Sequence, residues 1–210
     1  MNKLIDHTSL KAETSKEDIV RLCNEAIEYE FASVCVNPCY VQLASDLLAN
    51  TNVKVCTVIG FPLGANTTDV KLYEISNAID NGADELDVVV NVGKVLDNDM
   101  LYVYNELKEI RQYTEGKVLK VIFETCLLSK DLIIRLCEIC KELRVDFVKT
   151  STGFSTYGAT IEDVSLMSGI VEPDCQVKAS GGIKSYEDAK LMIKSGAKRI
   201  GTSNGVLICK

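Results

Sequence analysis

Short apolar runs rich in Val, Ile and Phe alternate along the chain with longer stretches in which apolar residues recur every three or four positions. Runs of about five such residues are typical of strands, and the three- to four-residue spacing is typical of amphipathic helices. The pattern predicts eight strands, at 4–8, 31–36, 53–59, 84–90, 118–123, 145–149, 175–179 and 198–202. The clearest helices are predicted at 15–30, 66–82, 99–114, 129–143 and 185–197.

Strands that alternate with helices in this way predict a parallel sheet. One strand, one helix and two loops take about 25 residues, so the 210 residues of the chain hold about eight such units. We therefore expect an α/β fold, a single (β/α)8 TIM barrel in which residues 1–210 form one catalytic domain. A doubly wound open sheet is the alternative, but no glycine-rich dinucleotide turn follows the first or second strand. Because the sequence stops close after the eighth strand, the last helix should be short.

Composition limits which partners the chain can bind and in which cellular compartment it is expected. The net charge of −7 and the absence of any run of Lys and Arg argue against nucleic acid or an anionic membrane as a partner. The nine cysteines are an odd number, and no basic and then apolar leader opens the chain, which favours a reducing, cytoplasmic compartment. The oligomeric state stays open, with a homodimer as one alternative.

Cysteine and histidine offer little for a metal site. Cys137 and Cys140 have CxxC spacing but lie in a helical pattern, where buried helix-face residues are the better interpretation. His7 is the only histidine, and most catalytic zinc sites use several. Whether Cys35 is reactive or simply buried stays open.

Two lysines close neighbouring predicted strands: Lys149 ends the sixth, and Lys178 lies next to the end of the seventh. In a barrel, the active site lies at the C-terminal ends of the strands. A single lysine there is typical of a surface side chain that keeps its charge in water. A matched pair followed by Gly-, Ser- and Thr-rich loops favours an active site instead. A second ammonium and an apolar wall lower the pKa of a lysine and so supply the neutral amine that a Schiff base needs. The pattern leaves open which lysine is the nucleophile.

Carboxylates accompany the lysines. Asp87 lies within the apolar fourth strand, where a buried carboxylate needs a cationic partner and, opposite a lysine, can move protons through water. The alternative is an Asp at the strand entrance with its face reversed. Asp6 is the matching polar residue of the first strand. Lys120 and Glu124 of the fifth strand either support the site or mark solvated strand ends.

Glycine-rich loops follow the last two strands, at 181–182 and 201–205, and Gly153 follows the sixth. Barrels commonly hold a phosphate at this position on backbone N–H groups. Glycines that only form turns explain either loop alone. Their occurrence after both strands favours a phosphate cradle, with Gly153 as a third wall.

Seven stretches of the chain resemble the deoxyribose-phosphate aldolase family, in the same order along nearly the whole length. They are IDHTSL (5–10), CVNP (35–38), TVIGFPLGA (57–65), ELDVVVNVG (85–93), DFVKTSTGF (146–154), KASGGIK (178–184) and RIGTSNG (199–205). The resemblance implies a class I aldolase that reversibly cleaves 2-deoxy-D-ribose 5-phosphate to D-glyceraldehyde 3-phosphate and acetaldehyde. It also implies that no metal and no organic cofactor takes part.

The same stretches imply roles for individual residues. Lys149 resembles the Schiff-base nucleophile, Lys178 the second lysine that perturbs its pKa and relays protons, and Asp87 the proton donor and acceptor. Asn204 stands where a second serine is frequent in the family, so no phosphate contact is assigned to it. The residues that resemble the substrate-binding set are Asp6, Gly153, Gly181, Gly182, Lys184, Gly201 and Ser203.

Other functions share parts of this pattern. A metal-dependent aldolase requires a zinc site that one histidine hardly builds. A pyridoxal-phosphate barrel also needs a Schiff-base lysine and a phosphate cradle. Other Schiff-base sugar-phosphate aldolases and transaldolases use the same chemistry on different donors, and a non-catalytic phosphometabolite-binding barrel would use its lysines only to neutralise charge.

Overall fold

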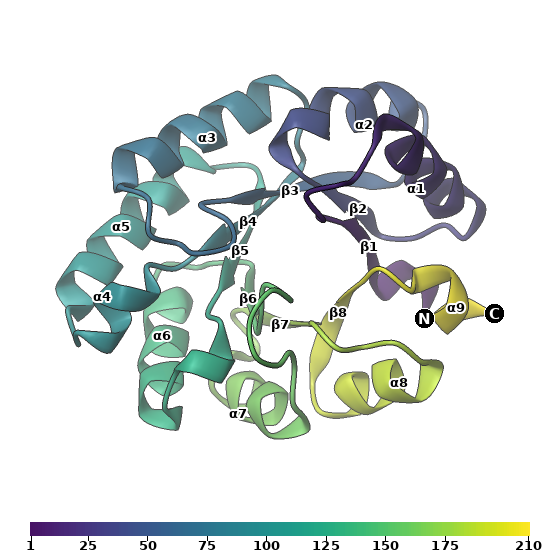
Figure 1. The fold of residues 1–210 in the computed structure, drawn as a ribbon. Coiled ribbons are helices and arrows are strands. Elements are labelled where there is room, and N and C mark those ends of the chain that lie inside the picture. The colour runs from purple at the N-terminus through teal and green to yellow at the C-terminus, as the bar shows by residue number, and fades with distance from the viewer.

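Eight parallel strands close into one barrel in the computed structural model, which describes residues 1–210. Each strand pairs with the next along the chain, and β1 pairs with β8 to close the ring (Figure 1). The (β/α)8 barrel predicted from the hydrophobic pattern is therefore confirmed. The strands are β1 (Ile5–Ser9), β2 (Ser33–Val36), β3 (Lys54–Ile59), β4 (Glu85–Val89), β5 (Val118–Ile122), β6 (Phe147–Lys149), β7 (Gln176–Ser180) and β8 (Ala197–Thr202).

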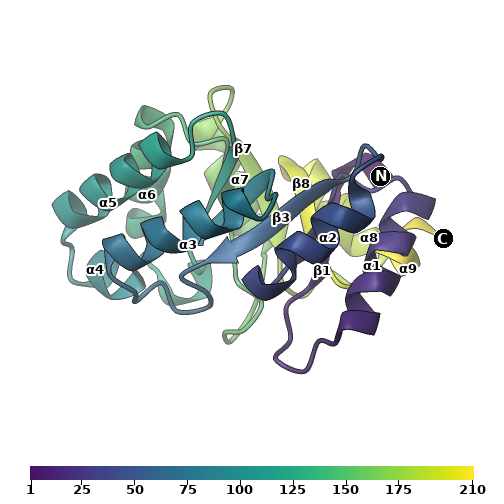
Figure 2. The same ribbon diagram turned by 90° about the horizontal axis from the view of Figure 1, so that it is seen from above.

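Helices surround the barrel on its outside, as Figure 2 shows from a second direction. Short 3-10 turns at Asn2–Leu4, Pro38–Tyr40 and Thr125–Leu127 accompany them. The helices are α1 (Lys16–Glu28), α2 (Val41–Leu48), α3 (Thr68–Asp80), α4 (Val92–Leu96), α5 (Met100–Tyr113), α6 (Lys130–Glu142), α7 (Ile161–Val171), α8 (Tyr186–Lys194) and α9 (Gly205–Cys209). The last helix is short, as expected, and none of the helices is long and apolar enough to cross a membrane.

Local sequence explains where several helices begin. Ser15 and Ser185 each form a capping box with the aspartate three residues later, which satisfies free backbone N–H groups of the first turn. The Ser129 side chain accepts a hydrogen bond from the backbone N–H of Leu132 at the start of α6. On α6, Cys137 and Cys140 are both buried and belong to the apolar core, which confirms that this CxxC spacing is a helix face.

The main apolar core lies between the strands and the helices, not inside the barrel. A cluster of 45 buried residues fills this layer and includes the outward-facing Val88, Val121, Val148 and Val177. Alternate residues of the same strands face inward, and many of them are charged. Barrel interiors are usually packed with branched apolar side chains, so the charged interior of this one calls for a functional explanation.

Candidate active site

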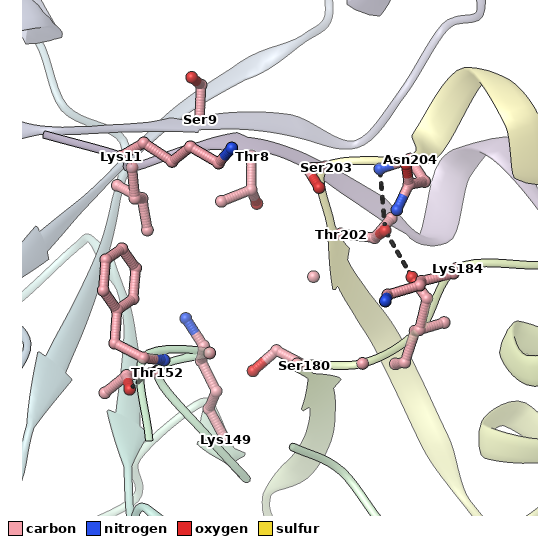
Figure 3. A pocket seen from close by; sticks show the side chains of 17 residues that line it. Thr8, Ser9, Lys11, Lys149, Thr152, Ser180, Lys184, Thr202, Ser203 and Asn204 are labelled. Carbon is pink, nitrogen blue, oxygen red and sulfur yellow. Dashed lines mark hydrogen bonds between the residues drawn. The ribbon is translucent and has the colours of Figure 1, made fainter. Parts of the chain in front are cut away.

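A cavity of about 360 Å³ opens at the C-terminal ends of the strands. Its charged side chains are Lys11, Lys149 and Lys184, all of them basic. Figure 3 shows the Lys149 amino group directed toward the middle of the cavity. The remaining lining residues are Thr8, Ser9, Leu10, Thr152, Gly153, Phe154, Ser180, Gly181, Gly182, Ile183, Gly201, Thr202, Ser203 and Asn204.

Lys149 and Lys178 lie side by side at the floor of this cavity. Their Cα atoms are direct register partners on β6 and β7, as the sequence pattern predicted. Lys149 is 3% exposed and reaches the cavity, whereas Lys178 is completely buried beneath it. Of the two, only Lys149 is therefore accessible to a substrate.

Asp87 joins the two lysines. Its Oδ2 accepts hydrogen bonds from the Nζ of Lys149 and the Nζ of Lys178, each at 2.7 Å, and its Oδ1 accepts one from Lys120 Nζ at 2.8 Å. Burial alone raises the pKa of the Asp87 carboxyl, but the attraction of the neighbouring lysines, Lys120 first, outweighs burial and holds this pKa well below its usual value. Asp87 is thus an anion at neutral pH, placed where it can exchange protons with Lys149.

Asp6 is a second fully buried carboxylate, one step farther from the cavity. Its Oδ2 lies 2.5 Å from Lys178 Nζ, and its Oδ1 accepts hydrogen bonds from Ser33 Oγ at 2.6 Å and Arg199 Nη1 at 2.5 Å. Burial alone raises the pKa of Asp6, but Lys178, Lys120 and Arg199 outweigh it and lower the pKa. The structure places Asp6 against these cations and not along the cavity wall, and a contact with substrate hydroxyls stays a prediction.

Two further charged residues, Glu85 and Arg199, complete the interior and were missed from the sequence. The guanidinium of Arg199 lies 3.2 Å from Glu85, and Lys120 Nζ lies 2.7 Å from the same carboxylate. The available signal was the period of two, since Glu85 precedes Asp87 by two residues and so faces the same side. Lys120 is fully buried, so of the two interpretations left open for it, support of the site is the one that fits.

Glu124 is also buried, directly after β5, and it holds the loop that follows β6. Its carboxylate accepts hydrogen bonds from the backbone N–H of Thr152, at 3.1 Å, and from the Thr152 hydroxyl. Its backbone adopts the left-handed conformation, with φ at 57°. Glu124 is therefore not a solvated strand end, because it fixes a loop that lines the cavity.

The residues expected to bind phosphate gather on one side of the cavity. Gly153, Gly181, Gly182, Lys184, Gly201 and Ser203 all line it, together with Asn204. Gly153, Gly181 and Gly182 have positive φ values, which side-chain-bearing residues rarely adopt. Thr202 donates a hydrogen bond to the carbonyl of Ile183 and accepts one from the backbone N–H of Asn204, so the loops after β7 and β8 are tied together (Figure 3).

The loops after β6 and β7 are joined to each other as well. The Ser180 hydroxyl donates to the carbonyl of Ser151 at 2.6 Å, and the backbone N–H of Ala159 donates to the carbonyls of Ser180 and Gly181. Gly158 packs so closely that a Cβ there would lie 2.1 Å from the Gly181 carbonyl oxygen. The loops that carry the glycines are thus held by one another.

Several lining residues were given no role from the sequence. Thr8, Leu10 and Phe154 lie in stretches that resemble the family, and Lys11 follows one of them, but only the closed barrel shows that they line the cavity. Phe154 packs edge-on against Phe61 of the loop after β3, with ring centres 5.2 Å apart. Spacing along one strand does not reveal such contacts between distant loops.

The residues that could bind a metal are already engaged. Ligand atoms of Cys35, Cys56 and Asp87 lie within 4.8 Å of one another. However, Asp87 is shared by three lysines, and the Cys56 thiol donates a hydrogen bond to Asp87 Oδ1 at 3.2 Å. His7 is buried against Glu25, with 2.7 Å between Nε2 and Oε2. A cation at the cysteine cluster would have to displace these lysine side chains, so the donor set fits a metal poorly.

Comparisons with known proteins identify the same family that the seven stretches of the sequence resemble. The family model described as DeoC/LacD family aldolase matches residues 1–210. The deoxyribose-phosphate aldolase of Clostridium perfringens strain ATCC 13124 is 55% identical over 209 residues, covering 99% of this chain and 93% of that protein. The one from Mycoplasma capricolum is 51% identical over 208 residues, covering 99% and 94%.

A solved structure gives the same result in three dimensions. The deoxyribose phosphate aldolase from Aeropyrum pernix, described as tetrameric, superposes with a TM-score of 0.91 at 37% identity. The match covers 99% of this chain and 88% of that one.

Proposed function

The chain belongs to the DeoC/LacD aldolase family and, within it, to the deoxyribose-phosphate aldolases, and from this premise we propose that Lys149 forms the Schiff base. The deoxyribose-phosphate aldolases are class I aldolases that reversibly cleave 2-deoxy-D-ribose 5-phosphate through a lysine Schiff base. One observation carries the assignment: of the basic groups gathered around Asp87, only Lys149 reaches the cavity. The amine that attacks a sugar must be the one that a sugar can reach.

The reaction begins with the neutral amine of Lys149. It attacks the C1 aldehyde of the open-chain sugar phosphate, and loss of water gives an iminium. Acetaldehyde contains two carbons, so the bond that breaks is C2–C3. The C3 hydroxyl loses its proton, the C2–C3 electrons move to the iminium, and glyceraldehyde 3-phosphate leaves an enamine on Lys149. Protonation at C2 and hydrolysis then release acetaldehyde.

Asp87 and Lys178 are the groups we assign to proton transfer. Asp87 contacts both lysines, and its carboxylate is the acceptor nearest to Lys149. Burial alone lowers the pKa of Lys178, but Asp6 and Asp87 outweigh burial and raise this pKa. Lys178 therefore remains a cation beside Lys149. A water between these groups and C2 or C3 provides the route for the proton.

The glycine loops and Lys184 are proposed to hold the phosphate. The cavity carries only basic charged side chains, which favours an anionic ligand in a chain with a net charge of −7. Backbone N–H groups of the loops after β7 and β8 offer further donors. Fixing the phosphate positions C1 of the substrate at Lys149, so that binding energy far from C1 assists the reaction.

Cleavage of 2-deoxyribose 5-phosphate tests this function. We expect the purified chain to release acetaldehyde, and Lys149→Met to reduce the rate at least about 1,000-fold because the covalent route is lost. Lys178→Leu should lose most activity at pH 7 and regain part of it at high pH, where Lys149 loses its proton without help. Equal activity in Lys149→Met and the native chain would contradict the assignment.

We also make proposals on the domain organisation, cellular location and oligomeric state of the chain. We propose that all 210 residues act as one catalytic domain, because strands from both ends of the chain pair to close the barrel. Nine free cysteines favour a cytoplasmic location, as expected from the sequence. A homodimer stays a prediction that sedimentation can measure, and the Aeropyrum relative is described as a tetramer.

A further inference from the structure

Six charged side chains form a closed ring inside the barrel, with signs that alternate at every step. Lys120 contacts Glu85 at 2.7 Å and Asp87 at 2.8 Å. Lys178 contacts Asp87 at 2.7 Å and Asp6 at 2.5 Å. Arg199 closes the ring by contacting Asp6 at 2.5 Å and Glu85 at 3.2 Å. Each carboxylate thus lies between two cations, and each cation between two carboxylates.

The ring is electrically neutral by itself, with three carboxylates against three cations. For five members of the ring, burial alone favours the uncharged form, but the opposite charges of their neighbours outweigh it. The pKa values of Asp6 and Asp87 are lowered, and those of Lys120, Lys178 and Arg199 are raised. All of these groups therefore carry their charge at neutral pH.

Lys149 is a seventh group, attached to the ring only through Asp87 Oδ2 at 2.7 Å. That oxygen already accepts a hydrogen bond from Lys178. Asp87 is the only carboxylate within ion-pair distance of Lys149 Nζ, and two ring cations already share it. An ammonium on Lys149 therefore adds one unmatched positive charge to a buried interior. A neutral amine leaves the interior balanced, and burial of unmatched charge is strongly unfavourable.

We infer that Arg199 and Glu85, which do not line the cavity, are positioning residues that set the charge balance of the ring and thereby keep Lys149 as the free amine. Arg199 acts through Asp6 and Lys178, and Glu85 acts through Lys120. The inference rests on the proposed function, because it concerns the nucleophile assigned there. According to this inference, charged groups that lie inside the barrel and away from the cavity control whether Lys149 is protonated.

Charge count predicts opposite effects for the two residues. Arg199→Gln leaves the ring with one excess negative charge, which a protonated Lys149 balances, so the free amine forms at higher pH. Glu85→Gln leaves one excess positive charge, so the free amine forms at lower pH. The double variant restores a neutral ring. An effect of packing alone has no reason to change sign between the two residues.

The measurement is the initial rate at which acetaldehyde is trapped on the protein by cyanoborohydride, from pH 5 to 9.5. At each pH, the rate of a variant is divided by the rate of the native chain. Acetaldehyde has no phosphate, so no substrate group titrates in this range. The acid limb is the part of the pH profile in which the trapping rate falls as the pH is lowered. We expect this limb to move up by about one pH unit in Arg199→Gln, so that the trapping rate is about tenfold lower near pH 6 and equal to the native rate at high pH. We expect Glu85→Gln to move the limb down by about as much, and the double variant to return it.

Lys198→Gln is the matched control. Lys198 is adjacent to Arg199 on β8, but its side chain is half exposed and pairs with Glu172 outside the barrel. Its loss changes the net charge by the same amount and should leave the limb unmoved. The other titratable groups near Lys149 are Cys35, Cys56, Lys11, Glu124 and Lys184, which are the same in every variant.

Shifts of equal sign, or losses that are uniform in pH, would overturn the inference. If Arg199→Gln alone fails to fold, Glu85→Gln and the double variant still carry the comparison. If the native chain forms no adduct at Lys149, the proposed function fails. If it forms the adduct but the limb stays fixed in the variants, only the role of the ring fails.

Discussion

At the scale of single residues, the buried carboxylates are the groups for which desolvation is most unfavourable and attraction to neighbouring cations is strongest. Asp6 and Asp87 are completely buried, which isolated carboxylates do not tolerate. Asp6 contacts Ser33, Lys178 and Arg199, so its charge is matched: Oδ1 accepts hydrogen bonds from Ser33 and Arg199, and Oδ2 forms an ion pair with Lys178. These contacts tie function to stability, because the same ion pairs position the proposed catalytic lysines.

Stability should therefore depend on pH through Asp6. Its folded pKa is depressed below the unfolded value of about 3.9, so its contribution is complete above that value and is lost as the pH falls toward the folded pKa. Asp6→Asn should destabilise the fold by about 3–5 kcal/mol at pH 7. The gap between the variant and the native chain should narrow below pH 4.

Urea unfolding at pH 7, 5, 4 and 3 measures this gap. Asp46→Asn is the control, since Asp46 is exposed on α2 and forms no ion pair. A gap that stays constant down to pH 3 would show that the carboxylate charge of Asp6 does not stabilise the fold.

At the scale of elements, the strands were the most predictable feature. All eight were predicted within two residues at each end, because outward-facing Val and Ile mark them clearly. Helices α2, α4 and α7 were not named, since α2 and α4 have only eight and five residues and α7 is apolar on most sides. Period-two alternation placed Asp87 but gave no sign that the inward face is the charged one. Glu85 and Arg199 become partners only when strands far apart in sequence close the barrel.

The contact between the loops after β6 and β7 makes a prediction at this scale. A Cβ at Gly158 meets the backbone of Gly181, which cannot yield without moving the Gly181–Gly182 loop. Gly158→Ala should raise KM for 2-deoxyribose 5-phosphate by about tenfold or more. Unphosphorylated 2-deoxyribose should be affected much less, because it has no phosphate to bind in the proposed cradle.

Steady-state kinetics on both sugars test this effect. Gly169→Ala is the control, because it lies in α7 with no atom within 4 Å of its added Cβ, and it should leave both KM values unchanged. An equal rise in KM for both sugars would contradict a phosphate site in these loops.

At the scale of the whole molecule, the net charge and the local charge have opposite signs. The chain carries −7, yet the charged side chains of its cavity are all lysines. Closing the barrel concentrates basic groups from separate strands at one mouth, which favours the proposed binding of an anionic sugar phosphate there. Global charge alone would have predicted repulsion of such a substrate, so the arrangement of charge matters more here than its sum.

The whole chain should act without a metal ion. Its one cluster of close metal-ligand atoms, at Cys35, Cys56 and Asp87, is occupied by lysine contacts, and its one histidine is paired with Glu25. Dialysis against EDTA should therefore leave the cleavage rate within about 10% of the untreated rate, because no step requires a Lewis acid. A large loss that zinc restores would contradict an amine mechanism.

The most direct test is to locate the covalent intermediate. The native chain is incubated with acetaldehyde and borohydride, digested and analysed by mass spectrometry. Reduction of the Schiff base should add an ethyl group to the peptide that contains Lys149, and Lys149→Met should show no such addition at the site. Labelling at Lys178 instead, or no labelling at all, would contradict the assignment of Lys149 as the nucleophile.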